Sequence, residues 1–224
     1  PRWPSRLCAV ALSILICESA LGLDLSPDNS DLSLNLNTTV SYGQVWRVEN
    51  QAEDNDLMNQ NDGNRNFDTG LASEVFKITS EAVFRHENYG AYVSGTAFYD
   101  TQIMDRSNDY ESNNDPFQPS GNFPNNSGFT DETRDEAGRN IELLDAYFYG
   151  NWIVADRLVS ARIGRQVFNW GEGLFYRGGL NSTNPVDVAK FRLPGSEVKE
   201  VLVPLGAVSI SSGITDNLTA EAFY

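Results

Sequence analysis

The fold class is decided by residues 32–48, which read LSLNLNTTVSYGQVWRV. Even-numbered positions from Leu32 to Trp46 are mostly apolar, whereas odd-numbered positions such as Asn35 and Ser41 are mostly polar. This alternation with a period of two predicts a β-strand that has one apolar and one polar face. The pattern is longer than the roughly five or six residues of a typical globular strand, and it suits a tilted strand that crosses a membrane.

The same alternation recurs along the chain. It is clearest in residues 76–85 and 159–164, and weaker strand patterns cover residues 90–99, 141–153, 200–212 and 218–224. Together with residues 32–48 these segments predict about seven strands. The class that they indicate is all-β.

The connections between the predicted strands alternate between long and short. The long ones are residues 49–74, 100–140 and 170–199, and the tight ones are residues 87–90, 154–157 and 212–217. Long loops on one side and short turns on the other are typical of an antiparallel transmembrane β-barrel, with the long loops outside the cell and the turns in the periplasm. Because single-chain bacterial barrels have even strand numbers, we expect residues 23–224 to be the N-terminal portion of a larger barrel, a fragment.

Composition and charge exclude other classes. The chain has 224 residues, 31 acidic against 16 basic side chains and a net charge of −15, so a nucleic-acid backbone is not its expected partner. After the first twenty or so residues no apolar run approaches the roughly 20 residues of a membrane-spanning helix.

The first 22 residues have the pattern of a secretory signal peptide. Arg2 and Arg6 precede an uncharged run over residues 7–17, and the small residues Ala20 and Gly22 follow. The alternative is a buried core helix. Cys8 and Cys17 both lie inside this segment, so the mature chain is expected to contain no disulfide, which is ordinary for a Gram-negative envelope protein.

Few residues offer catalytic or metal-binding chemistry. His86 is the one histidine, and no G-x-S-x-G elbow, P-loop or dinucleotide fingerprint is present, so we predict no enzyme, no cofactor and no metal site. A hydrolase that uses His86 is the alternative. Residues 100–140 hold nine acids against three arginines, and we interpret them as a solvated loop, with calcium bridging to lipopolysaccharide as the second interpretation.

The most distinctive stretch lies between residues 164 and 195. Its motif residues are Gly164, Arg165, Gln166, Trp170, Gly171, Glu172, Arg177, Gly178, Gly179, Asn184, Pro185 and Asp187. We expect a strand that ends in an aromatic residue at the membrane interface, followed by a loop that folds back toward the lumen. Arg165 falls on the face assigned to lipid, so a bulge or a position level with the headgroups is expected there.

Four cations of this region are candidates for a basic patch at a constriction of the lumen. They are Arg162, Arg177, Lys190 and Arg192. Such a patch favours anionic solutes. The alternative is charge pairing with Glu172, Asp187, Glu197 and Glu200.

This stretch, extended through Glu197, Glu200, Leu202, Pro204 and residues 215–218, resembles a family of large outer-membrane barrels of Gram-negative bacteria catalogued as domain of unknown function 1302. The resemblance is good over residues 160–224 and loose over the signal peptide and first strand. It implies a porin-like or export barrel that works with an inner-membrane efflux protein and a periplasmic lipid carrier on hydrophobic cargo. It supplies no catalytic or ligand residue.

The function that we expect is transport of a small or lipid-like solute across the bacterial outer membrane. The predicted partners are outer-membrane lipid and lipopolysaccharide. The alternative is a structural or adhesive surface barrel whose acidic loops bind cations or lipopolysaccharide.

Overall fold

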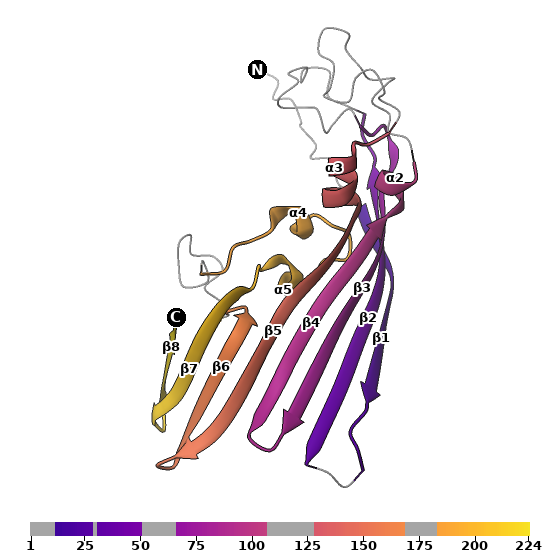
Figure 1. The fold of residues 1–224 in the computed structure, drawn as a ribbon. Helices are drawn as coiled ribbons and strands as arrows, with labels where there is room; N and C mark the ends of the chain where they lie inside the picture. Colours follow the sequence, from indigo (N-terminus) through magenta and orange to yellow (C-terminus); the bar gives the residue numbers. More distant parts are fainter. Residues whose placement is uncertain (1–11, 29–30, 51–65, 107–127, 169–182) are drawn as a thin grey trace, which may run out of the picture. The chain divides into compact units, whose positions relative to one another are not determined.

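The computed structural model describes residues 12–28, 31–50, 66–106, 128–168 and 183–224. They form one antiparallel sheet whose eight strands follow one another in sequence order (Figure 1). The strands are β1 (Leu12–Asp24), β2 (Leu32–Arg47), β3 (Gly70–His86), β4 (Tyr89–Asp100), β5 (Arg139–Val154), β6 (Arg157–Gln166), β7 (Leu205–Thr215) and β8 (Leu218–Phe223). Within the described ranges, none of the helices has the length and apolar character that a membrane-spanning helix requires.

The all-β prediction is confirmed, and β2 to β8 are the seven strands that the sequence predicted. The number of strands is nevertheless eight, because β1 occupies residues 12–24, most of which we assigned to the signal peptide. The buried core helix that was the alternative for this segment is wrong for residues 12–24. Cleavage of residues 1–22 stays a prediction, and so does closure of the sheet into a barrel, since β1 and β8 are the two edges of the sheet as described.

The alternation of long and short connections is confirmed. The three predicted tight turns, between β3 and β4, β5 and β6, and β7 and β8, have two residues each, and the turn residues Glu87, Ala155 and Asp156 have positive φ angles of 50°, 48° and 58°. This left-handed backbone matches the twist of adjacent antiparallel strands, which is why two-residue hairpins use it.

The long connections contain short helices that the sequence analysis missed. They are α2 (Thr101–Met104), α3 (Asp131–Thr133), η1 (Arg134–Gly138), α4 (Val188–Phe191) and α5 (Val198–Val201). The strand predicted over residues 200–212 therefore begins only at Leu205, because α5 occupies its first residues. Helices of a single turn have no apolar periodicity that a sequence pattern could reveal.

The chain forms two compact units. Unit 1 comprises residues 1–18, 41–77 and 98–140, and unit 2 comprises residues 19–40, 78–97 and 141–224. In unit 1 the Asp100 carboxylate is 1% exposed and accepts hydrogen bonds from the Ser73 hydroxyl at 2.5 Å and from the Gln102 backbone N–H at 2.8 Å. Asp100 thereby ends β4 and caps α2.

In unit 2 the register places apolar and polar side chains on opposite faces of the sheet. Phe148 of β5 lies opposite Ile163 of β6, which lies opposite Val208 of β7, and all three are exposed. We call this the apolar face. The adjacent row, Tyr149, Arg162 and Ser209, belongs to the other face, which we call the polar face.

Candidate functional site

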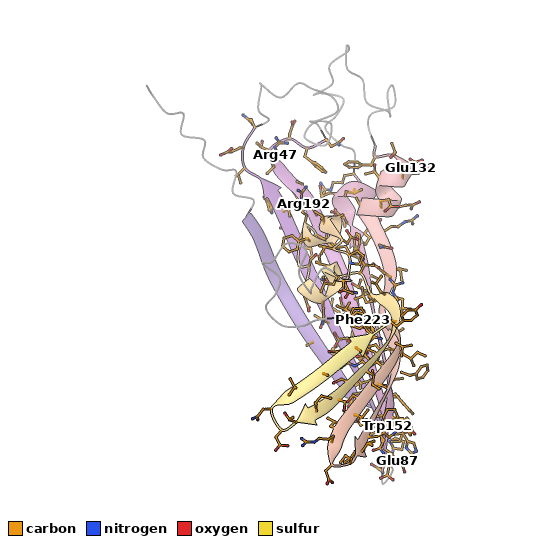
Figure 2. All side chains as sticks on the ribbon, turned by 90° about the vertical axis from the view of Figure 1, so that its left-hand side faces the viewer. Arg47, Glu87, Glu132, Trp152, Arg192 and Phe223 are labelled. Atoms are coloured by element: carbon orange, nitrogen blue, oxygen red, sulfur yellow. The ribbon has the colours of Figure 1, made fainter. Side chains whose placement is uncertain are left out.

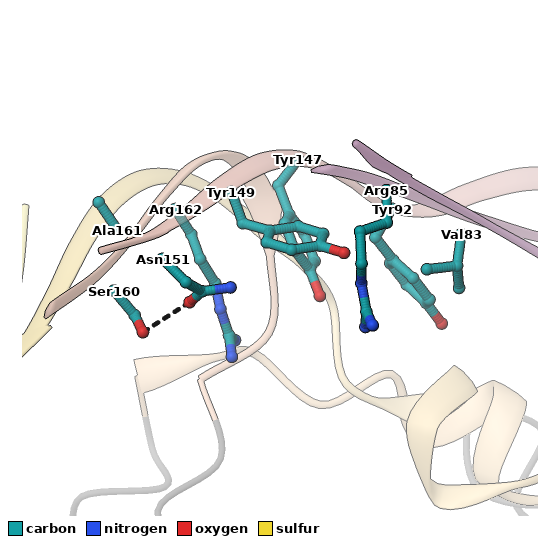
Figure 3. A pocket seen from close by; sticks show the side chains of 9 residues that line it. All are labelled: Val83, Arg85, Tyr92, Tyr147, Tyr149, Asn151, Ser160, Ala161 and Arg162. Carbon is teal, nitrogen blue, oxygen red and sulfur yellow. Dashed lines mark hydrogen bonds between the residues drawn. The ribbon is translucent and has the colours of Figure 1, made fainter. Parts of the chain in front are cut away.

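A pocket of about 250 Å³ opens on the polar face of unit 2 (Figure 3). Four strands contribute to its lining, which includes Val83 and Arg85 of β3, Tyr92 of β4, Tyr147 and Tyr149 of β5, and Arg162 of β6. The lining residues of β3 and β5 lie two positions apart, so the period of two seen in the sequence is what gathers them on one face.

Aromatic contacts order the pocket. The rings of Tyr92 and Tyr147 stack with their centroids 5.3 Å apart, and the guanidinium carbon of Arg162 lies 5.5 Å from the centroid of the Tyr147 ring. Beside them the Ser160 hydroxyl donates a hydrogen bond of 2.7 Å to the Asn151 side-chain oxygen. Gly90 leaves room for this arrangement, because a Cβ there would lie 2.3 Å from the Tyr149 ring.

The segment formed by residues 183–204, which we call the inserted segment, folds onto the same polar face. Its α4 is tied to β5 by an ion pair between Lys190 and Glu142. Its α5 is tied to β3 by an ion pair of 2.6 Å between Lys199 and Glu81. Figure 1 shows both helices on one side of the sheet. Residues 183–204 of the loop that was predicted to return therefore fold back onto the sheet, and a lumen on this side of it stays a prediction.

Buried polar groups join α5 to the sheet. The Glu200 carboxylate is 3% exposed and accepts a hydrogen bond of 2.6 Å from the Thr79 hydroxyl, which lies 3.1 Å from the Thr96 hydroxyl. Burial lowers the pKa of Lys199, but the hydrogen bonds from Lys199 to Glu81 and Glu197 outweigh burial and raise the pKa above its ordinary value. Lys199 is therefore charged at neutral pH.

The first motif, Gly164-Arg165-Gln166, ends β6. Gly164 has a φ of 138°, and a Cβ there would lie 2.4 Å from the Ala146 carbonyl oxygen, so only glycine fits. The bulge that we expected at Arg165 is wrong, because β6 pairs with β7 through this residue and with β5 up to it, in both cases without a shift of register. The irregularity of the strand lies instead at Gly164, whose φ is positive. The Arg165 guanidinium lies 3.7 Å from the Glu142 carboxylate. A position level with the headgroups stays a prediction.

Gln166 is 1% exposed and ties β6 to β7. Its side-chain nitrogen donates a hydrogen bond of 3.0 Å to the Ala207 carbonyl oxygen, and its side-chain oxygen accepts one of 3.2 Å from the Ser209 hydroxyl. Both polar atoms of the Gln166 side-chain amide thus hold the end of β6 against β7.

Asn184, Pro185 and Asp187 organise the inserted segment. The Asn184 side chain is 2% exposed, accepts a hydrogen bond of 2.8 Å from the Phe168 N–H and donates one of 2.9 Å to the Val203 carbonyl oxygen. The Pro185 carbonyl oxygen accepts from the Val203 N–H at 2.8 Å. Asp187 caps α4 by accepting from the backbone N–H groups of Ala189 and Lys190. These motif residues therefore close the loop on itself.

The predicted basic patch is divided in the structure. Arg162 lies in the pocket, whereas Lys190 is paired with Glu142 and lies 3.6 Å from Asp187, as the charge-pairing alternative predicted for Asp187. Arg192 is exposed just after α4. Outside the described residues lie Arg177 and the motif residues Trp170, Gly171, Glu172, Gly178 and Gly179.

Arg85 and the three tyrosines of the pocket were not predicted as site residues. The alternation in residues 76–85 had already placed Arg85 on the polar side of its strand. The pairing order of four strands is needed to bring it toward Arg162, and a single strand pattern does not contain that order.

No group of three or more His, Cys, Asp or Glu side chains in the described part of the chain is placed to hold a metal ion. Much of the acidic loop lies outside that part, because residues 107–127 are not described. His86 is exposed at the end of β3.

The structure defines an antiparallel sheet protein whose polar face holds a pocket and a folded-back loop segment, and whose other face exposes apolar side chains. A family model described as "Protein of unknown function (DUF1302)" matches residues 3–224, so the chain belongs to this family. The match confirms the resemblance to domain of unknown function 1302 and extends it well beyond residues 160–224. No curated protein and no solved structure matches the chain.

Proposed function

We propose that this sheet is a wall of a porin-like or export β-barrel in the outer membrane of a Gram-negative bacterium, and that its polar face lines a path for a small or lipid-like solute. The observation that supports this proposal best is the row of exposed large apolar side chains on the apolar face of unit 2. Phe148 is 70% exposed and Ile163 is 58% exposed, while Ser209 of the polar face is 4% exposed. A contiguous exposed apolar surface marks a site of contact with another apolar surface. In a transmembrane barrel, the outward-facing apolar side chains contact the lipid tails.

Aromatic residues at the strand ends support a membrane location. Tyr89 begins β4 and is 57% exposed, and its ring contacts that of Trp152 at 5.8 Å. Figure 2 shows Trp152 beside Glu87, at the end of the sheet where the hairpin turns lie. Ten residues of a strand tilted by about 45° span roughly 24 Å, which matches the apolar band of a transmembrane barrel.

The polar face has the properties of a solute path narrowed by a loop. The inserted segment is fixed to β3 and β5 by the pairs of Lys199 with Glu81 and of Lys190 with Glu142. The attraction within an ion pair offsets part of the desolvation penalty that each charge would pay alone against the inside of a barrel. A tethered segment of this kind limits the width of the path and leaves the arginine and tyrosine pocket beside it accessible.

The proposed partners follow from the two faces and from the family resemblance. The apolar face would contact outer-membrane lipid, and lipopolysaccharide would surround the outer loops. A periplasmic lipid carrier and an inner-membrane efflux protein would supply the cargo.

Reconstitution of the protein into planar lipid bilayers tests the proposal. Stepwise ion current is expected, and the double variant Lys190→Gln, Lys199→Gln should give larger steps, because the inserted segment loses both tethers. Arg139→Gln, which removes an exposed pair with Asp135, is the matched control and should leave the step size unchanged. A protein that inserts but stays silent, in both wild type and double variant, contradicts a path and favours the structural or adhesive alternative.

A further inference from the structure

The pocket on the polar face contains two cations, Arg85 and Arg162, from strands β3 and β6. Arg139, Arg157, Arg165, Lys190 and Lys199 each lie within 4.0 Å of a carboxylate. Arg85 and Arg162, in contrast, form no ion pair with any residue that the structure describes. Although the chain has 31 acidic and 16 basic side chains, both of these arginines line the pocket without a carboxylate of the described residues paired to them.

The geometry keeps both guanidinium groups available. Arg162 lies over the face of Tyr147, a cation–π contact that fixes the side chain without using its N–H donors. Arg85 projects toward the same side of the sheet as Arg162 (Figure 3). Each guanidinium group has five N–H donors in a planar fork that matches a carboxylate or a phosphate.

Tyrosine rings fill the space between the two arginines. Arg85 is on β3 and Arg162 is on β6, so the strands that separate them, β4 and β5, contribute Tyr92, Tyr147 and Tyr149. Three strand spacings separate the backbones of Arg85 and Arg162 by about 14 Å, and the tyrosine rings lie in that interval, so the ring of a bound anion would rest against their faces. The pocket thus combines aromatic faces with a cation on either side.

We propose that this pocket binds organic anions that carry an aromatic ring, with the carboxylate or phosphate held by Arg85 or Arg162 and the ring against the tyrosines. The inference rests on the proposed function, because it names the class of solute that the path would select. It also corrects the predicted constriction patch, in which Arg162 was grouped with Lys190 and not with Arg85.

The test is calorimetric titration of the folded full chain in detergent micelles with benzoate, phenyl phosphate and uncharged benzamide. We expect benzoate or phenyl phosphate to bind at least tenfold more tightly than benzamide. Arg85→Gln and Arg162→Gln should each weaken binding by about tenfold, because each removes charge-assisted hydrogen bonds. Which of the two anions binds more tightly identifies the carboxylate or the phosphate as the preferred group.

The matched control is Arg157→Gln, which removes the same charge from β6 at a position where Arg157 pairs with Asp216 outside the pocket. It should leave binding unchanged. Benzamide binding as tight as benzoate binding overturns the proposal, and so does equal weakening by Arg157→Gln or the absence of binding by either anion. Binding in micelles does not require transport, so the two proposals can fail separately. If the anions bind but no ion current is seen in bilayers, the transport proposal is rejected and the binding pocket stands. If ion current is seen but the anions do not bind, the binding pocket is rejected and the transport proposal stands.

Discussion

Substitution of Asn184 by alanine tests how the inserted segment is held. The Asn184 side chain is 2% exposed. Its amide joins two backbone segments, because it accepts a hydrogen bond of 2.8 Å from the Phe168 N–H and donates one of 2.9 Å to the Val203 carbonyl oxygen. Alanine leaves both backbone groups buried without these partners. An unsatisfied buried group costs about 1–3 kcal/mol, so the loss for the two groups together is about 3 kcal/mol.

Hydrogen exchange measures this loss where it occurs. At 1.4 kcal/mol for each factor of ten, a loss of about 3 kcal/mol accelerates exchange of the Phe168 amide by about a hundredfold. The Val203 amide, which donates to the Pro185 carbonyl oxygen at 2.8 Å, should exchange faster in parallel. Asn217→Ala in the exposed turn after β7 is the control and should change neither rate. Unchanged protection of both amides in Asn184→Ala would refute the closure of the loop by this side chain.

Three further substitutions test local features by urea unfolding in micelles. Gly164→Ala should lower the free energy of unfolding by about 3 kcal/mol because of its φ of 138° and its contact with β5, whereas Gly206→Ala, with open space around its Cβ position, should change it by less than about 1 kcal/mol; equal effects would contradict the argument. Ala155→Asn should raise the free energy of unfolding by about 0.5 kcal/mol, since asparagine tolerates a φ of 48° better than alanine, and a lower unfolding midpoint would be the contrary result. A double-mutant cycle of Lys199→Met with Glu81→Gln should give a coupling of about 0.5–1 kcal/mol, the range for a half-exposed pair, and a coupling of zero would remove this pair from the tethers of α5.

The strands were predictable because their signal is local. In residues 32–48 and 76–85, side chains two positions apart share an environment, so the period of two in the sequence is the period of the sheet itself. The hairpin turns were predictable for the same reason, since the apolar pattern stops on both sides of them. Asn184 and Gln166 were singled out by the sequence as motif residues, but their roles as clamps depend on backbone groups 16 to 41 residues away.

The pocket could not be predicted because it depends on the order and register of four strands. Arg85 and Arg162 are far apart in the sequence, and only the pairing of β3 through β6 in sequence order brings them to one face. Arg165 shows the opposite problem. Strict alternation assigned it to the apolar side, but the positive φ of Gly164 precedes it, and its guanidinium lies beside the Glu142 carboxylate.

The central claim is that one face of the sheet contacts lipid and the other contacts water. Single nitroxide labels on introduced cysteines test it most directly, after replacement of Cys8 and Cys17 by serine and reconstitution into liposomes. Labels at Phe148, Ile163 and Val208 should collide mainly with oxygen dissolved in the bilayer, and labels at Tyr149 and at the exposed Asn151 of the polar face mainly with a water-soluble nickel chelate. The same accessibility to the nickel chelate at all five positions, or recovery of the protein in the aqueous phase without liposomes or detergent, would contradict the account.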